Sequence, residues 1–122
     1  MSTISFANNF RDAMLSYKNG EFEKAKILFE KSIKEESASL AYYFLGIMHL
    51  KGQGTAENSS QAIPYLEQAA LKGNLKAKCF LAEAYIKNKD KKDEVLSLLK
   101  DGIDNNTKEC IDIAATYGIS IK

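Results

Sequence analysis

The stretch that decides the fold is residues 41–77, which read AYYFLGIMHLKGQGTAENSSQAIPYLEQAALKGNLKA. Apolar residues on both sides of its centre recur every three or four positions, which is the period of an amphipathic helix. Gly52-Gln53-Gly54 separates the two apolar runs, and Gly73 follows the second. Because glycine readily takes the left-handed conformation that ends helices, the stretch predicts two helices joined by a loop.

The same helical period continues on both sides of this stretch. No strand pattern competes with it, because β-branched residues never alternate with polar ones for more than a few positions. Ser59 or Ser60 is expected to cap the fourth helix, and if Ser60 does so, Pro64 falls in its first turn. The expected helices cover about 6–17, 22–33, 40–51, 61–71, 75–87, 91–104 and 108–117. The fold class is therefore predicted to be all-α.

Every second helix carries an equivalent apolar residue, followed four positions later by an aromatic residue or histidine. These anchor residues are Ala13, Leu45, Leu81 and Ile113, and they are spaced by 32, 36 and 32 residues. A single helical hairpin cannot bury its apolar stripe alone, so such hairpins stack into a solenoid. We expect one domain, 1–122, with units of about 6–37, 38–74 and 75–106 and a closing helix at 107–122.

The sequence also predicts where the helices of this solenoid approach most closely and how its C-terminal end is arranged. Gly46, Ala69, Ala82 and Gly102 are expected where two helix backbones approach closely. Ile119 and Ile121, at the end of the chain, either fold back over the last hairpin or form an adhesive end for a partner or a second copy. We expect the first arrangement.

Residues 41–77 resemble the Sel-one-like repeat, a short relative of the tetratricopeptide repeat. The resemblance rests on the double-glycine loop, the Ala69-Ala70 pair and the terminal Gly73. The stretch departs from the family pattern at four positions: His49 for Tyr, Thr55 for Val, Asn58 for Asp and Gln61 for Lys. The outer units lack the double-glycine loop and look more like tetratricopeptide repeats. The resemblance implies a short right-handed α-solenoid that holds other proteins and has no catalysis of its own.

Composition and charge exclude several classes of function. The chain has 122 residues and a net charge of +1, and Arg11 is its only arginine, so a nucleic-acid partner is not expected. Met1 to Asp12 shows no targeting pattern, and the most apolar run, 40–48, is too short to cross a bilayer. We therefore expect a cytoplasmic protein with no membrane association, as a monomer or weak homodimer.

The few chemically reactive residues do not form a recognisable site. Cys79 and Cys110 are expected to be reduced and buried, although whether they come close enough to pair stays open. Gly52-Gln53-Gly54 follows a helix and not a strand, so it predicts a repeat loop and not a phosphate loop. His49, the only histidine, is expected to be a packed, hydrogen-bonded core residue. No catalytic residue, cofactor or metal is expected.

The odd-numbered helices of a stacked hairpin array line its concave side. Residues two before the anchor, and two and five after it, should then point into a groove, with charged residues at its edges. The alternative is that so short an array curls enough to bury these residues itself. The predicted partner-binding residues are Arg11, Leu15, Lys18, Tyr43, Ile47, Leu50, Lys51, Cys79, Glu83, Ile86 and Lys87.

The sequence thus predicts a non-enzymatic module that binds a protein partner: a toxin, an enzyme or an assembly component. One version is an inhibitor or immunity protein that neutralises a cognate toxin, and the other is a small assembly adaptor or chaperone that binds a peptide or helix. A small enzyme is a remote alternative, because the groove offers only Glu83, Cys79 and lysines. The run 87–92, with four lysines and one aspartate, is either a solvated loop or a contact to a partner's acidic surface.

Overall fold

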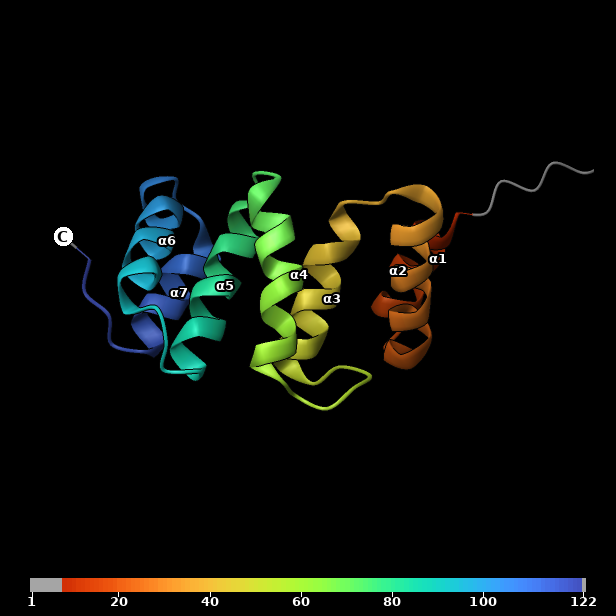
Figure 1. Cartoon of the computed structure of the whole chain (residues 1–122), viewed down its shortest axis with the longest axis horizontal. Coiled ribbons are helices and arrows are strands. Elements are labelled where there is room, and N and C mark those ends of the chain that lie inside the picture. Colours follow the sequence, from red (N-terminus) through yellow and green to blue (C-terminus); the bar gives the residue numbers. More distant parts are fainter. Residues whose placement is uncertain (1–7, 122) are drawn as a thin grey trace, which may run out of the picture.

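The computed structural model describes residues 8–121, and within that range all regular structure is helical. The predicted start of the first helix at Phe6 lies outside the described residues. Figure 1 shows the helices succeeding one another from one end of an elongated molecule to the other. They are α1 (Asn9–Lys18), α2 (Phe22–Glu36), α3 (Leu40–Lys51), α4 (Ser59–Leu71), α5 (Leu75–Lys87), α6 (Lys92–Asp104) and α7 (Lys108–Thr116).

The helices pack as hairpins, α1 with α2, α3 with α4 and α5 with α6, and α7 packs against both α6 and α5. Helix α5 also contacts α3, whereas α2, α4 and α6 make no comparable contacts with one another in the described residues. The closer spacing of α3, α5 and α7 puts the odd-numbered helices on the inner side of the array. The predicted all-α solenoid is confirmed.

The start of α4 differs from the prediction. Its cap is Asn58, whose extended backbone lets the side-chain oxygen accept from the Gln61 N–H at 3.0 Å. Ser60 is therefore already inside the helix, and Pro64 lies in the second turn, where it is exposed. The expectation of a serine cap with Pro64 in the first turn was wrong, because the Asn58 side chain, and not a serine, accepts from the Gln61 N–H.

Helix α2 extends to Glu36, beyond its predicted end at 33. The extra turn brings the Glu36 carboxylate to the start of α1, where its two oxygens accept from the backbone N–H groups of Asn9 at 2.6 Å and Phe10 at 3.2 Å. Those N–H groups have no partner within α1, and a negative charge at a helix N-terminus is favourable. Glu36 thus joins the two helices of the first hairpin.

The core consists of two clusters that meet at α3. The first lies between α1, α2 and α3, where the Phe29 and Phe44 rings stack with centroids 5.1 Å apart. The second runs from α3 to α7 and includes Leu50, Leu66 and Leu99, all fully buried. Helix α3 contributes to both clusters, so it connects the N-terminal hairpin to the rest of the solenoid.

Two glycines allow neighbouring helices to approach closely, as expected. A Cβ added at Gly46 would lie 2.6 Å from Cγ of Leu66 on α4, and one added at Gly102 would lie 2.7 Å from Cβ of Cys110 on α7. Neither position has room for a side chain.

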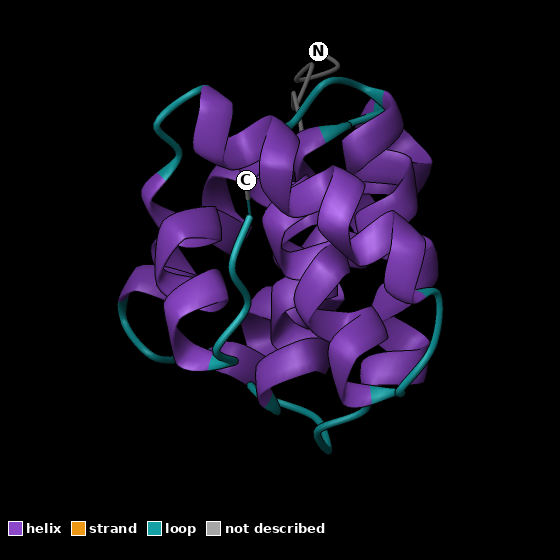
Figure 2. Ribbon diagram, turned by 90° about the vertical axis from the view of Figure 1, so that its left-hand side faces the viewer, coloured by secondary structure: helices purple, strands orange, loops and turns teal. Residues whose placement is uncertain are grey.

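The C-terminal tail folds back over the last helices. Gly118 ends α7 with φ of +65°, and the Ile119 N–H donates to the Ala114 carbonyl at 2.8 Å. Ile119 and Ile121 then pack, half-buried, against the second core cluster. Figure 2, which looks at this end of the molecule, shows the tail crossing it. The first of the two arrangements considered for the tail is confirmed.

Cys79 of α5 and Cys110 of α7 form a disulfide bond, so the expectation of two reduced thiols was wrong. Both residues are fully buried, as predicted, and their Cα atoms are 4.8 Å apart. They meet because α7 packs directly on α5. The bond ties the closing helix to the third hairpin.

Candidate protein-binding face

The exposed side of the odd-numbered helices is called the inner face here, and its exposure changes along the solenoid. On α1, Arg11, Leu15 and Lys18 are all exposed, and the Leu15 side chain reaches 55% exposure. On α3, Tyr43 and Ile47 are half-buried. The inner face is therefore accessible mainly over the first two hairpins.

Two predicted groove residues are not on the surface at all. Leu50 and Cys79 are fully buried, so their assignment to the groove was wrong. Helix α5 contacts α3, and α7 contacts α5. These contacts bury positions on α3 and α5 whose equivalents on α1 are exposed. Both alternatives considered for the inner face thus apply, self-burial in the C-terminal half and exposure in the N-terminal half.

Tyr43, Ile47 and Lys51 are spaced four residues apart on α3 and form one stripe, called the α3 stripe below. The Tyr43 ring is held between Phe44, at 5.2 Å, and Phe80 of α5, at 6.2 Å between centroids. Its hydroxyl makes no hydrogen bond to residues 8–121. Burial, with the Glu109 carboxylate and Tyr17 adding to it, raises the pKa of Tyr43 to about 12, so the phenol is neutral.

Glu83 connects three helices of the inner face. Its carboxylate accepts from the Lys51 ammonium at 3.2 Å and from the Tyr117 hydroxyl at 3.0 Å, and the residue is only 6% exposed. Burial first, and the hydrogen bond to Glu83 second, raise the pKa of Tyr117 to about 12. Glu83, predicted to contact a partner, therefore has both its oxygens engaged in holding α3, α5 and α7 together.

Two residues of this arrangement were not predicted. Phe80 supports Tyr43 and also lies 5.5 Å below the Lys51 ammonium, measured to its ring centroid. Phe44 and Phe80 each stand directly before the anchor residue of their unit. This recurrence in the sequence could have indicated that Phe80 lies on the inner face. Tyr117 aligns with Tyr17 four residues after the anchor, but no sequence pattern indicated that it bonds Glu83.

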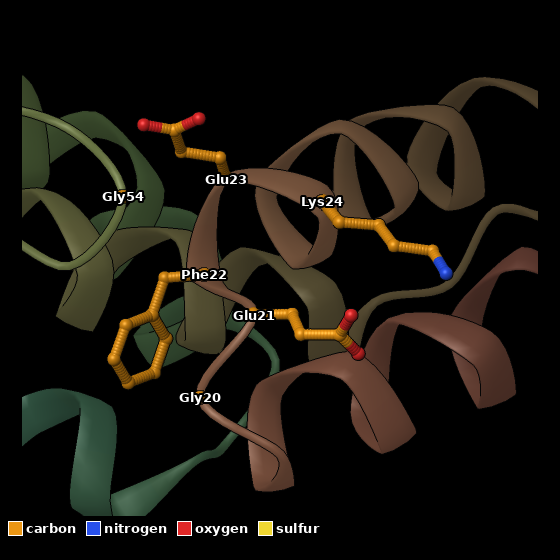
Figure 3. A pocket seen from close by; sticks show the side chains of 6 residues that line it. All are labelled: Gly20, Glu21, Phe22, Glu23, Lys24 and Gly54. Atoms are coloured by element: carbon orange, nitrogen blue, oxygen red, sulfur yellow. The ribbon is translucent and has the colours of Figure 1, made fainter.

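The double-glycine loop fastens the first hairpin to the second. Figure 3 shows Gly54 passing beside the first turn of α2, where Phe22 and Glu23 begin the helix. The neighbouring Gln53 accepts a hydrogen bond from the Tyr17 hydroxyl at 2.7 Å. The carboxylates of Glu21 and Glu23 line the depression at this point and would repel a phosphate. The geometry agrees with a repeat loop.

The remaining predicted residues of α5 lie toward its C-terminal end. Lys87 is exposed and forms an ion pair with Glu57 of the α3–α4 loop at 3.1 Å. Ile86 is half-buried and lines a cavity that also contains Ile119 of the tail. Neither residue continues the α3 stripe.

His49 is packed in the core, as expected, but the predicted hydrogen bonding of its ring is not found in residues 8–121. Its ring stacks on Tyr65 at 5.4 Å, and Nδ1 has no hydrogen-bond partner in the described part of the chain. Burial first, and the nearby Lys26 second, lower the pKa of His49. The imidazole is therefore neutral at pH 7.

In the described residues no three histidine, cysteine, aspartate or glutamate side chains gather in a way that could hold a metal ion. None of the helices between residues 8 and 121 has the length and apolar content needed to cross a bilayer.

The fold and the inner face define a protein of stacked helical hairpins. Residues 39–74, which contain α3, the double-glycine loop and α4, match the family model described as Sel1 repeat. The chain thus contains a stretch that matches the Sel1 repeat, as its resemblance implied. Sel1 repeats generally mediate protein–protein interaction and are typically non-enzymatic modules. No curated protein matches the chain.

Proposed function

We propose that this chain binds a partner protein through the α3 stripe, with the exposed Arg11, Leu15 and Lys18 of α1 extending the contact. The observation that carries the proposal is Tyr43. Its ring is held in place by two phenylalanines while its hydroxyl has no partner in residues 8–121. A rigid, half-exposed tyrosine loses little conformational entropy on binding and supplies both apolar area and a hydrogen bond.

The neighbours of Tyr43 support the same role. Ile47 adds apolar surface one turn along the stripe, and Lys51, whose side chain is 41% exposed and whose ammonium pairs with Glu83, forms its polar end. On α1, Leu15 lies between Arg11 and Lys18 on a stripe of the same kind. Apolar residues with a charged edge are the usual composition of a recognition surface.

The more specific form of the proposal is an inhibitor or immunity protein that neutralises one cognate toxin. Such a role predicts a tight one-to-one complex and a loss of the partner's activity on binding. Charge at the edge of the interface steers association, so replacing Lys51 by Gln should slow complex formation more than dissociation. The adaptor or chaperone alternative predicts micromolar binding to several peptides and no inhibition.

The experiment is affinity purification of the tagged protein from its own cells, with mass spectrometry and light scattering of the eluate. The proposal expects one stoichiometric protein partner with the wild type. That partner should be lost with Ile47→Asp and kept with the control Leu71→Asp, because Leu71 is 81% exposed on α4, away from the stripe. Equal recovery with both folded variants would refute the assignment of the face.

The cytoplasmic location expected from the sequence stays a proposal, and the disulfide bond argues against it. Cytosolic reductants keep most thiols reduced, whereas Cys79 and Cys110 are bonded here. The test is to quench the cells in acid, alkylate free thiols of the denatured protein, and count the alkylated cysteines by mass spectrometry. Two alkylated cysteines would indicate the cytoplasm, and an unlabelled protein an oxidising compartment.

A further inference from the structure

A cavity of about 400 Å³ lies at the C-terminal end of the solenoid, called the end cavity below. Its floor is apolar and comes from three elements: Ile86 of α5, Val95 and Leu96 of α6, and Ile119 of the tail. Leu96 is 40% exposed. The end of the molecule where the tail crosses in Figure 2 is thus hollowed, with accessible apolar side chains.

Basic side chains from the α5–α6 loop and the start of α6 form the rim of the end cavity. Lys89 and Lys92 line it, and neither forms an ion pair with a carboxylate of residues 8–121. The other two lysines of the run 87–92 are engaged, Lys87 at the end of α5 with Glu57 at 3.1 Å and Lys91 over the Tyr85 ring at 5.1 Å. Of the three lysines of this run that form no ion pair in residues 8–121, Lys89 and Lys92 line the cavity.

One carboxylate, that of Asp90, also lines the end cavity. The Asp90 side chain accepts from the backbone N–H of Lys91 at 2.8 Å. Asp93 and Glu94, in the first turn of α6, do not line the cavity. The rim therefore carries two lysines and one aspartate, a positive balance of charge, beside a site that suits an apolar group.

We propose that the end cavity binds a segment of a partner protein in which one bulky apolar side chain is flanked by acidic residues. The apolar side chain fills the space over Leu96 and Ile119, and its neighbouring carboxylates pair with Lys89 and Lys92. Burial of the apolar group supplies most of the affinity, and the paired charges select for acidic flanks.

This surface is distinct from the α3 stripe of the proposed function. The cavity is built from the end of α5, the start of α6 and the tail, whereas Tyr43 and Ile47 lie on α3. Variants of one surface can therefore be made without touching the other, and failure of one proposal leaves the other standing.

The test is fluorescence anisotropy with a labelled, blocked peptide that has one leucine with two aspartates on each side. We expect saturable one-to-one binding. Lys89→Glu and Lys92→Glu should each weaken it about fivefold, a size typical of one charge pair. Leu96→Glu should abolish binding, whereas the control Lys31→Glu, an exposed lysine on α2, should leave it unchanged within twofold. Tyr43→Ala, on the other surface, should also leave it unchanged.

Three results would overturn the proposal. The first is the absence of saturable binding of the acidic peptide to the wild-type protein. The second is equal binding of a matched peptide in which lysines replace the aspartates. The third is an increase in molecular mass by light scattering, abolished by Leu96→Glu, in protein without peptide, because the occupant would then be a second copy of this chain.

Discussion

A Cβ atom added to Gly54 would lie 2.7 Å from the carbonyl carbon of Phe22, in the first turn of α2. The double-glycine loop of the second hairpin therefore rests directly on the backbone of the first. Gly54 also has φ of +72°, a conformation that residues with side chains rarely adopt. The glycine is required both by its own backbone and by its neighbour.

This contact predicts that Gly54→Ala lowers the free energy of unfolding by about 2 to 3 kcal/mol. The matched control is Gly73→Ala, where φ is +87° but nothing lies within 4 Å of the added Cβ, so the loss should be about 1 kcal/mol. Urea denaturation of both variants measures the difference. If Gly54→Ala costs no more than Gly73→Ala, the loop does not rest on α2.

The disulfide bond should make a large contribution to stability. Cys79 and Cys110 are separated by 31 residues, and closing a loop of that length stabilises a protein by about 3 to 4 kcal/mol in the chain-entropy model. Replacing both cysteines by alanine should lower the free energy of unfolding by that amount. The reduced wild type, prepared by unfolding and refolding in reductant, should have the same free energy of unfolding as the double variant. Equal free energies of unfolding for the oxidised and the reduced wild type would contradict the bond.

Glu36 should stabilise the first hairpin by capping α1. Glu36→Gln removes the charge that two backbone N–H groups donate to, so the free energy of unfolding should fall by about 1 kcal/mol. Its neighbour Glu35 makes one long, exposed contact to the Asn9 side chain at 3.4 Å. Glu35→Gln should therefore change stability by less than about 0.5 kcal/mol, and a loss as large as that of Glu36→Gln would exclude the cap.

His49 predicts a dependence of stability on pH. Because burial lowers its pKa below the ordinary value of 6.5, the unfolded chain binds a proton more readily than the folded one. Its contribution is therefore constant above pH 6.5 and declines as the pH falls below that value. Urea denaturation between about pH 7 and pH 5 should show this decline in the wild type and a smaller one in His49→Tyr. Identical profiles would mean that His49 titrates alike in both states.

The parts that sequence predicted well are those that depend on neighbours along the chain. The apolar period of α3 and α5 located these helices, and the glycine at position 46 indicated a close helix contact, because both follow from the repeat itself. The cap at Asn58 was missed because three adjacent polar residues compete for one N–H, and only the backbone conformation decides among them.

The inner face was harder to predict because its exposure depends on contacts distant in sequence. Leu15 and Cys79 belong to the same predicted set, yet one is exposed and the other fully buried. The difference arises because α7 closes over α5, whereas no helix within residues 8–121 covers α1 in this way. The repeat period is the same in both units, so it could not reveal this asymmetry or the disulfide that accompanies it.

The claim that the α3 stripe binds a partner protein is tested most directly by comparing Ile47→Asp with Leu71→Asp in the same purification. Both replace an apolar side chain by a charge, and Leu71 lies away from the stripe on α4. With both variants shown to be folded by circular dichroism, we expect the stoichiometric partner to be absent from Ile47→Asp and present with Leu71→Asp. Retention of the partner by Ile47→Asp would contradict the claim.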